Sequence, residues 1–298
     1  MKVGITGASG FLGSALIAQA NGRQWSVAAF SRDPDKPIEG ADEVRSLGGG
    51  EKIDLDGLDA LIHLAGEPLV GLWTKEKKRR IRESRVGLTS ALVGDIGSLS
   101  RSRRPPVLVS ASAVGYYGDR GDEWLDEEAD VGFGFLAEVC RDWEAAAAKA
   151  SRLGVRVVTP RLGLVLGKGG LLKRLRPIFR AGLGGPLGKG DQWMSWIHVE
   201  DAARVFLECV ANDDVTGRVN CAAPNPATNR EFTRTYAASL KRKAFLRVPG
   251  AALKRLPGGM GRMFLDSQRV APVVMRAFDY RWLHEDLESA LRAIEAET

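Results

Sequence analysis

Short apolar runs alternate with longer segments of helical periodicity along much of this chain. The first run begins at Lys2 and leads through a glycine-rich turn into an Ala- and Leu-rich segment that starts at Phe11. Comparable apolar runs cover residues 25–32, 58–65, 107–113 and 154–162. Runs of this length are typical of strands that are buried on both faces. Their alternation with helical segments predicts an α/β protein with a doubly wound parallel sheet.

The turn after the first strand carries Gly7, Gly10 and Gly13 at a regular spacing. Glycine tolerates positive φ and has no Cβ, so the backbone can approach a phosphate group closely. The free N–H groups at the start of the following helix then face the anion. In the first strand–helix unit this pattern predicts a dinucleotide-binding turn, with an ordinary glycine-rich turn as the alternative. The residues expected to contact the cofactor are Thr6, Gly7, Ser9, Gly10, Phe11 and Leu12.

The end of the second strand, at Ser31 and Arg32, bears on which cofactor binds. An acidic residue at this point accepts hydrogen bonds from the ribose 2′-OH of NAD, whereas arginine accommodates the 2′-phosphate of NADP. A hydroxyl and a guanidinium suit a phosphate by charge and by geometry. We therefore predict NADP(H) rather than NAD(H). The neighbouring Asp33 weighs against this choice, and an exposed loop arginine is the alternative interpretation of Arg32.

Small residues follow the third strand, where the predicted cofactor contacts are His63, Leu64, Ala65 and Gly66. They leave room for a cofactor in the crevice at the carboxyl ends of the strands. His63 lies within an apolar run, where a hydrogen-bonded core histidine is the commoner case. Glu67 is a candidate for substrate binding. The basic segment 75–85 is typical of a solvated helix face, with an anion or partner site as the alternative.

Hydroxyl groups follow the strand at 107–110, in the form of Ser112, Tyr116 and Tyr117. The carboxyl ends of parallel strands share one edge of a sheet, so we expect these groups beside the glycine turn. They are the candidate catalytic residues.

The second half of the chain offers candidates for substrate binding. Residues 167–190 are rich in glycine and basic side chains, which fits an acidic or phosphorylated substrate as well as a mobile surface loop. Trp193 and Trp196 add aromatic surface beside amides and hydroxyls, typical of a ligand pocket or of a packing wedge between lobes. Further candidates are Asn225, Arg262, Gln268 and Arg269.

These segments predict two lobes. At 298 residues the chain can hold one large α/β core with a smaller appended lobe. We expect a dinucleotide-binding domain formed by residues 1–166 and 196–222. Residues 167–195 and 223–298 are expected to form a substrate lobe that includes a C-terminal helical domain.

Composition argues against several classes of function. Lys plus Arg exceed Asp plus Glu by 43 to 37, which suits a phosphorylated ligand and does not require nucleic acid. The three cysteines lack metal-ligand spacing, so we expect reduced thiols and no metal site. No apolar run approaches membrane-spanning length, and Met1 and Lys2 lead directly into a strand. We therefore expect a cytoplasmic protein that binds a small-molecule substrate and neither nucleic acid nor membrane.

Four stretches of the chain carry a family pattern, namely residues 6–13, 63–66, 110–118 and 196–201. They resemble the extended, epimerase-like branch of the short-chain dehydrogenase/reductase superfamily. Longer strings are similar to one epimerase-like subfamily with a small C-terminal domain of its own, at residues 135–144, 192–198, 223–232 and 265–270. The resemblance implies a Rossmann-like sheet and a homodimer, with Arg161 and Leu164 as cofactor contacts.

The chain departs from that superfamily at its reactive pair. The superfamily carries Tyr-x-x-x-Lys on the helix after the serine strand, with Tyr as general acid or base and Lys lowering its pKa. The aligned positions hold Leu136 and Cys140, which supply neither a proton relay nor a cation. Ser112 of the usual site is retained.

This departure leaves three hypotheses for the function. The first is an NADP(H)-dependent oxidoreductase or epimerase acting on a small polar or sugar-like substrate, with Tyr116 or Tyr117 as proton donor and Ser112 orienting a carbonyl group. The second is a catalytically silent NADP(H)-binding redox sensor or regulatory protein. The third is an isomerisation in which the nucleotide has a structural role. We favour the first, and all three require cofactor binding.

Overall fold

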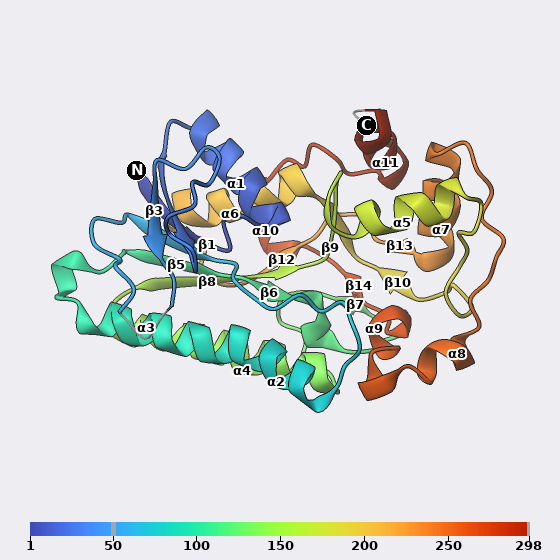
Figure 1. Ribbon diagram of the computed structural model, residues 1–298, viewed down its shortest axis with the longest axis horizontal. Coiled ribbons are helices and arrows are strands. Elements are labelled where there is room, and N and C mark those ends of the chain that lie inside the picture. The colour runs from blue at the N-terminus through green and yellow to red at the C-terminus, as the bar shows by residue number, and fades with distance from the viewer. Residues whose placement is uncertain (49–51, 297–298) are drawn as a thin grey trace.

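The structure, a computed structural model, describes residues 1–48 and 52–296. Its centre is a sheet of parallel strands in the order β12-β8-β5-β4-β1-β2-β3 (Figure 1). These strands are β1 (Lys2–Thr6), β2 (Ser26–Ser31), β3 (Glu43–Ser46), β4 (Ala60–His63), β5 (Val107–Ser110), β8 (Arg156–Leu162) and β12 (Gly217–Cys221), and β6 (Ser112–Ala113) pairs with β8. The predicted doubly wound sheet is confirmed. Its strand order reverses between β1 and β4, where open α/β sheets bind their ligands.

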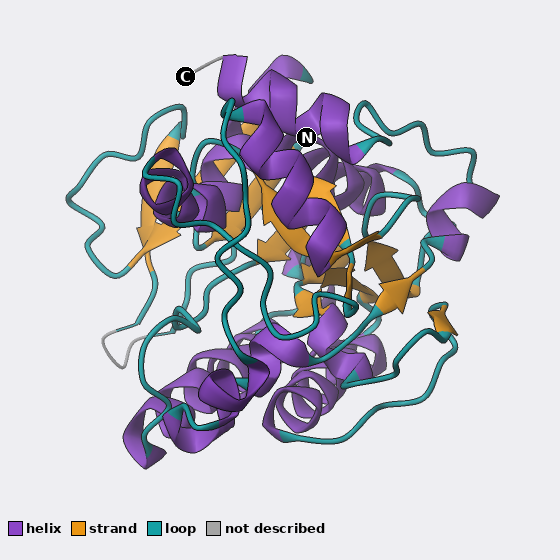
Figure 2. Cartoon of the chain, turned by 90° about the vertical axis from the view of Figure 1, so that its right-hand side faces the viewer, coloured by secondary structure: helices purple, strands orange, loops and turns teal. Residues whose placement is uncertain are grey.

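Helices cover both faces of the sheet, because the strands carry apolar side chains on both sides. Val3 and Ile5 of β1 pack on one face, and Leu61 of β4 and Leu108 of β5 pack on the other. The first face is covered by α1 (Phe11–Gly22), α6 (Val199–Ala211) and α10 (Val273–Ala277), and the second by α2 (Lys75–Arg82), α3 (Leu88–Ser98) and α4 (Phe135–Ala148). Figure 2 shows the strands between these helical layers. Within residues 1–48 and 52–296, the helices lack the continuous apolar length that a bilayer-spanning segment needs.

A separate apolar core holds the smaller lobe together. Its helices are α5 (Gly170–Arg180), α7 (Asn229–Ser239) and α11 (Leu287–Ala296). Leu172 and Phe179 of α5 are buried there against Tyr236 of α7 and Leu291 of α11. The short helices α8 (Gly250–Lys254) and α9 (Arg262–Leu265) lie at the same end of the molecule (Figure 1). The lobe thus draws its helices from separated parts of the chain.

Short strand pairs connect the lobe to the sheet. The pairs are β9 (Leu164–Leu166) with β11 (Trp196–His198), β7 (Trp124–Leu125) with β14 (Arg269–Val270), and β10 (Trp193–Met194) with β13 (Ala227–Thr228). The C-terminal part is shared between the two cores, because Met275 of α10 packs in the sheet core and Leu291 in the lobe core. The lobe boundaries expected from the sequence stay a prediction.

The turn between β1 and α1 is closely packed, which explains its glycines. Gly7 has a φ of +72°, in the left-handed region that favours glycine. A Cβ at Gly13 would clash with the carbonyl oxygen of Gly7 and lie 2.5 Å from that of Ala8. The turn also packs against the end of β4, since a Cβ at Gly7 would lie 3.0 Å from the Ala65 nitrogen.

Gly13→Ala should therefore destabilise the protein by about 1–3 kcal/mol, the usual cost of overpacking a filled position. Gly22→Ala in the same helix is the control, because nothing lies within 4 Å of a Cβ at Gly22. There, alanine should gain up to about 1 kcal/mol. Urea unfolding measures both free energies. Unchanged stability of the Gly13→Ala protein would contradict the close packing of this turn.

Candidate active site

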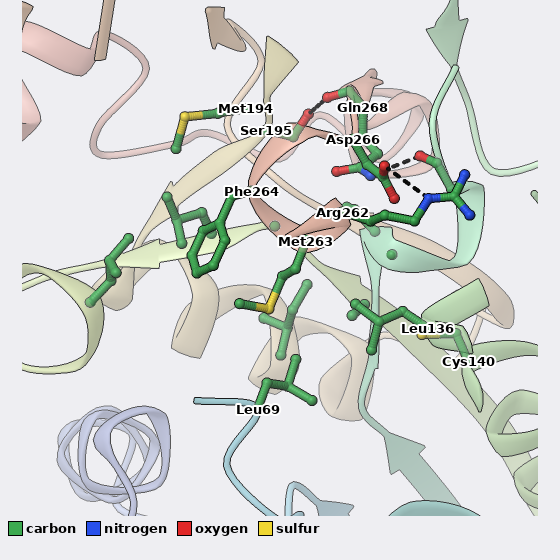
Figure 3. Close-up of a pocket in the computed structure, with 18 of the residues that line it drawn as sticks. Leu69, Leu136, Cys140, Met194, Ser195, Arg262, Met263, Phe264, Asp266 and Gln268 are labelled. Carbon is green, nitrogen blue, oxygen red and sulfur yellow. Dashed lines mark hydrogen bonds and ion pairs between the residues drawn. The ribbon is translucent and has the colours of Figure 1, made fainter. Parts of the chain in front are cut away.

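A cavity of about 900 Å³ opens between the carboxyl edge of the sheet and the smaller lobe. This volume lies near the upper end of the roughly 300–1,000 Å³ of small-molecule sites. The predicted site residues that line it are Phe11, Leu12, Leu64, Ser112, Leu164, Trp193, Arg262 and Gln268. Leu136 and Cys140, which the resemblance places at the positions of the reactive pair, also line it (Figure 3). The structure therefore brings the sheet edge, α4 and the lobe together around one space.

Hydrogen bonds between the ends of β1 and β4 hold the glycine turn in place. Thr6 Oγ1 accepts the backbone N–H groups of Leu64 and Ala65, at 3.1 and 3.2 Å. It also lies 2.7 Å from Nδ1 of His63, whose other ring nitrogen lies 3.0 Å from Thr89 Oγ1 of α3. Burial lowers the pKa of His63 to about 4. His63 is therefore a neutral, hydrogen-bonded core residue, and its buried side chain has no exposed surface for the cofactor contact predicted from the sequence.

The outer part of the sheet edge carries Ser31 and Arg32. Ser31 Oγ accepts the N–H of Asp33 at 3.1 Å, and the Asp33 carboxylate pairs with Lys36 at 2.6 Å. Arg32 is exposed at the end of β2. The acid that weighs against NADP(H) in the sequence is thus paired with a lysine, while the guanidinium of Arg32 is accessible to a phosphate.

Glu67 faces a cluster of basic side chains and does not line the cavity. Lys77 Nζ donates to Glu67 Oε1 at 2.6 Å. This hydrogen bond lowers the pKa of Glu67, with further contributions from Arg80 and Arg32. Glu67, a predicted substrate-binding residue, therefore lies outside the cavity.

Arg85 lines the cavity and was missed in the sequence, where the basic segment 75–85 favoured a solvated face. Its guanidinium donates to the Glu67 carbonyl at 3.0 Å and lies 5.4 Å from the centre of the Trp143 ring. Burial lowers the pKa of Arg85. The helical spacing of Ile81 and Arg85 on one inward face is the signal that could have identified it.

A buried ion pair between Arg161 of β8 and Glu144 of α4 lies beneath the cavity. Arg161 Nε and Nη2 donate to the two Glu144 carboxylate oxygens at 2.8 and 2.9 Å. Its Nη1 donates to the Tyr117 hydroxyl at 2.9 Å, and its guanidinium lies 3.5 Å from the centre of the Tyr116 ring. Burial alone would lower the pKa of Arg161, but Glu144 raises it, so the cation persists. The Arg161 side chain is fully buried in this network, so it has no exposed surface for the cofactor contact that the resemblance implied.

Of the predicted catalytic hydroxyl groups, that of Ser112 lines the cavity and donates to Glu144 Oε1 at 2.7 Å. Tyr117 is fully buried, with its oxygen 2.7 Å from Asn220 Oδ1. Burial raises the pKa of Tyr117 to about 12. Tyr116 packs against it with ring centres 5.5 Å apart. Neither tyrosine is placed to exchange a proton with a ligand, because the hydrogen bonds and the packing of both are internal.

The remaining predicted substrate residues divide between the cavity and the packing around it. Trp193 lines the cavity, and Arg269 lies between Trp193 and Trp124, 4.1 Å from each ring centre. Trp196 is fully buried and donates its indole N–H to the Asn225 carbonyl at 2.9 Å. Trp196, Asn225 and Arg269 are therefore not part of the cavity lining, and their contacts are with other parts of the protein.

Asp266 is a second cavity residue that the sequence did not single out. Its Oδ1 lies 3.8 Å from Nε of Arg262 (Figure 3). Burial raises the pKa of Asp266 to about 6, Asp119 adds to the shift and Arg262 opposes it. The Cys140 thiol in the same cavity has its pKa raised by burial to about 11. Asp266 therefore changes its protonation near neutral pH, and no local sequence signal reveals this because its burial comes from distant segments.

Three residues outside the cavity lining could hold a cation. His198, Glu200 and His284 each place a ligand atom within 4.8 Å of the others. The two imidazole rings are tilted by 38° with centres 3.9 Å apart, and His198 Nδ1 accepts the Glu200 N–H at 3.3 Å. The sequence predicts no metal site, and in this cluster the His198 lone pair already caps the start of α6.

Residues 3–222 match the model of the NAD dependent epimerase/dehydratase family. The chain belongs to this family. Residues 248–294 match a domain of unknown function, DUF1731, in the position of the small C-terminal domain expected from the resemblance. The epimerase-like resemblance is therefore confirmed across both parts of the chain.

Several relatives match this chain over nearly its whole length. The chloroplastic SDR39U1 homolog of Arabidopsis thaliana is 38% identical over 99% of this chain and 86% of its own. YfhF of Bacillus subtilis is 31% identical over 100% of this chain and 99% of its own. The crystal structure of human epimerase family protein SDR39U1 (isoform 2) with NADPH has a TM-score of 0.89 at 32% identity, covering 100% of both chains. The nucleoside-diphosphate sugar epimerase of Corynebacterium glutamicum has a TM-score of 0.81 at 34% identity, covering 100% of this chain and 58% of its own.

Glu144→Gln should lower the free energy of unfolding by about 3–5 kcal/mol, because it leaves the buried Arg161 charge without its partner. Glu288→Gln is the matched control, since Glu288 forms an exposed ion pair with Arg292 on α11. Exposed pairs contribute about 0–1 kcal/mol. Urea titration followed by circular dichroism measures both variants, and similar costs for the two would contradict the stabilising role of the buried pair.

Proposed function

We propose that this chain binds NADP(H) and acts as an oxidoreductase on a small carbonyl or hydroxyl compound, through a site without the Tyr-x-x-x-Lys pair. The observation that carries the proposal is the shared cavity. One space is lined by Leu12 at the glycine turn, by Ser112 at the sheet edge and by Asp266, whose carboxyl titrates near neutrality. Cleft residues with shifted pKa values are typical of catalytic sites.

The residues of the turn fit the cofactor. Gly10 is the N-cap of α1 and no side chain caps that helix, so the helix N-terminus is available to a pyrophosphate. Ser9 and Gly10 are exposed, and Arg32 at the neighbouring strand end offers a guanidinium to a 2′-phosphate. The 32% identical human relative was solved with NADPH, which supports the same choice of cofactor.

Asp266 takes the acid–base role that Leu136 and Cys140 cannot fill. The bound cofactor supplies or accepts a hydride. In reduction, the Asp266 carboxyl gives its proton to the substrate oxygen, and in oxidation its carboxylate removes that proton. The Ser112 hydroxyl donates a hydrogen bond to Glu144, so its oxygen can accept a hydrogen bond from a substrate hydroxyl.

The substrate class expected from the sequence is small and polar or sugar-like. One 34% identical relative is named a nucleoside-diphosphate sugar epimerase. The chemistry proposed for Asp266 and Ser112 does not depend on that class, since it requires one carbonyl or hydroxyl group. A homodimer and a cytoplasmic location stay predictions from the sequence.

A catalytically silent NADP(H)-binding sensor is the second candidate. It is favoured by Leu136 and Cys140, which remove the superfamily's proton donor and cation from the cavity wall. It requires tight NADPH binding without turnover of any carbonyl or alcohol. A measurable rate of hydride transfer would exclude it.

Arg32→Ala should weaken NADPH binding about tenfold or more, because a charge-assisted hydrogen bond contributes about 1.5–3 kcal/mol. NADH affinity should stay unchanged, since NADH lacks the 2′-phosphate. Arg152→Ala, at an exposed arginine beyond α4, controls for the loss of one positive charge. Titration followed by nicotinamide fluorescence measures all affinities. An unaltered preference for NADPH would rule out the contact assigned to Arg32.

Asp266→Asn should lower the rate of carbonyl reduction about 100-fold or more, because it removes the proton donor. In the wild type the rate of reduction should fall as pH rises through about 6, since the carboxyl form is the donor. Glu123→Gln, at an exposed partner of Arg120, is the control and should keep the wild-type profile. Stopped-flow NADPH oxidation at pH 5 to 9 gives the profiles.

A folding readout separates this role of Asp266 from a structural one. The raised pKa means that the fold favours the neutral carboxyl, so its contribution to stability is lost as pH rises from about 4 through 6. Asp266→Asn should therefore raise the melting temperature at pH 8 and leave it unchanged at pH 4. A variant that melts lower at both pH values would indicate a structural role instead.

A further inference from the structure

The lobe side of the cavity is apolar, although the segment that forms it is rich in basic residues. Leu171, Leu175 and Phe179 of α5 line the cavity at intervals of one helical turn. The basic side chains of α5 do not line the cavity. Arg176 donates to both carboxylate oxygens of Glu295 at 3.0 Å, on the side of α5 that packs against α11. The basic segment 167–190 therefore does not present its charge to a ligand in this cavity.

Apolar side chains from other segments continue this wall. Met194 of β10 and Phe232 of α7 line it from the lobe, and Met263 and Phe264 line it from α9. Leu69 lines the opposite side. In Figure 3, Leu69, Met263 and Phe264 surround the same space, and Met194 is drawn above them. A ligand in this half of the cavity meets hydrocarbon and sulfur on several sides.

Two glutamine side chains on this side form hydrogen bonds with backbone carbonyl groups of the cavity wall. Gln192 Nε2 donates to the Leu187 and Phe264 carbonyls at 3.1 and 2.9 Å. Gln268 Nε2 donates to the Gly118 carbonyl at 2.7 Å. These bonds fix the shape of the cavity and leave the amides few groups to offer a ligand.

Among the described residues that line it, the lobe half of the cavity presents no cluster of cations to a substrate diphosphate. Among the described residues, the cations that line it are Lys78, Arg85 and Arg262. Arg262 faces Asp266, whose ionised form cancels its charge. Arg85 bonds to backbone at the α2 side, and Lys78 Nζ lies 5.1 Å from the Phe135 ring centre. A buried phosphate requires paired cations, whereas the lobe half offers a balanced pair in an apolar wall.

We infer that the substrate is an apolar ketone or aldehyde, or the matching alcohol, with an aromatic or branched hydrocarbon body. This inference rests on the proposed oxidoreductase function and replaces the polar or sugar-like class expected from the sequence. The hydrocarbon body packs against Leu171, Leu175 and Phe179, and the single oxygen lies toward Arg262 and Asp266. The cavity volume of about 900 Å³ accommodates the nicotinamide end of a cofactor and such a body together.

The reaction balances with NADPH as the reductant. A hydride leaves NADPH and forms a C–H bond at the carbonyl carbon, while the C=O π bond breaks toward oxygen. The Asp266 carboxyl gives its proton to that oxygen. The products are the alcohol, NADP⁺ and an Asp266 carboxylate, which water protonates again.

Turnover of a graded substrate series tests the inference. The wild type is assayed with NADPH and methyl ketones of increasing alkyl length, with phenyl-substituted ketones, and with NADP⁺ and UDP-glucose. We expect kcat/KM to rise about fourfold per methylene until the cavity is filled, which is about 0.8 kcal/mol per buried CH₂. UDP-glucose should give no turnover. Turnover of UDP-glucose with flat, low rates for the ketones would overturn the inference and leave the proposed function standing.

A variant pair ties the effect to the lobe wall. Leu175→Asn should lower kcat/KM for the longest ketone about tenfold or more and leave NADPH affinity unchanged, because Leu175 lies on the lobe side. Leu183→Asn is the matched control, at a leucine of the same segment that is 60% exposed and does not line the cavity. Equal losses in the two variants would overturn the assignment of this wall.

A binding assay decides the inference if hydride transfer is not observed at all. N-Phenyl-1-naphthylamine, an uncharged fluorophore that brightens in apolar sites, is bound to the NADPH-loaded protein and displaced by competitors. Displacement that strengthens with ketone length supports an apolar ligand even where the oxidoreductase proposal fails. Displacement by UDP-glucose and not by the ketones would overturn the inference.

Discussion

The buried guanidinium of Arg161 is the interaction on which the candidate site depends. A charge removed from water is tolerated only where partners satisfy it on all sides. Those partners come from α4 through Glu144, from the turn after β6 through Tyr117, and from the Glu127 carbonyl. Ser112 donates to the same Glu144 carboxylate. The ion pair between Glu144 and Arg161 therefore also fixes the position of the Ser112 hydroxyl in the cavity.

Buried polar contacts also attach the C-terminal segment to this floor. The buried Glu127 carboxylate accepts the N–H groups of Asn220, Val273 and Val274, which joins β12 to the start of α10. Ser267 donates its N–H to Asp119 at 3.0 Å and its hydroxyl to the Gly121 carbonyl at 2.6 Å. Satisfied buried polar groups rigidify a structure, since each is costly to leave unpaired. The cavity thus lies between two parts that are locked together by specific hydrogen bonds.

The sequence predicts the sheet and the glycine turn, because each depends on local pattern or spacing. The sequence does not predict the position of the Tyr117 hydroxyl. Residue order places this phenol at the sheet edge, but its burial depends on hydrogen bonds to Arg161 and Asn220, which lie far away in the chain. The basic composition of α5 wrongly suggests that this helix presents positive charge to the cavity. Its basic residues dominate the segment, yet the spacing of Leu171, Leu175 and Phe179 already marks the inward face. The burial of Asp266 depends on segments far away in the chain, so it could only be seen in the structure.

The placement of α11 has a consequence for synthesis of the protein. Leu172 on the back of the cavity wall packs in the core that Leu291 and Ile294 of α11 complete. During synthesis α5 leaves the ribosome long before α11. In the nascent chain the apolar surface of α5 is therefore exposed until α11 is made. Such surface attracts chaperones and promotes aggregation. The cavity wall that contains α5 can therefore complete its packing only after α11 has been synthesised.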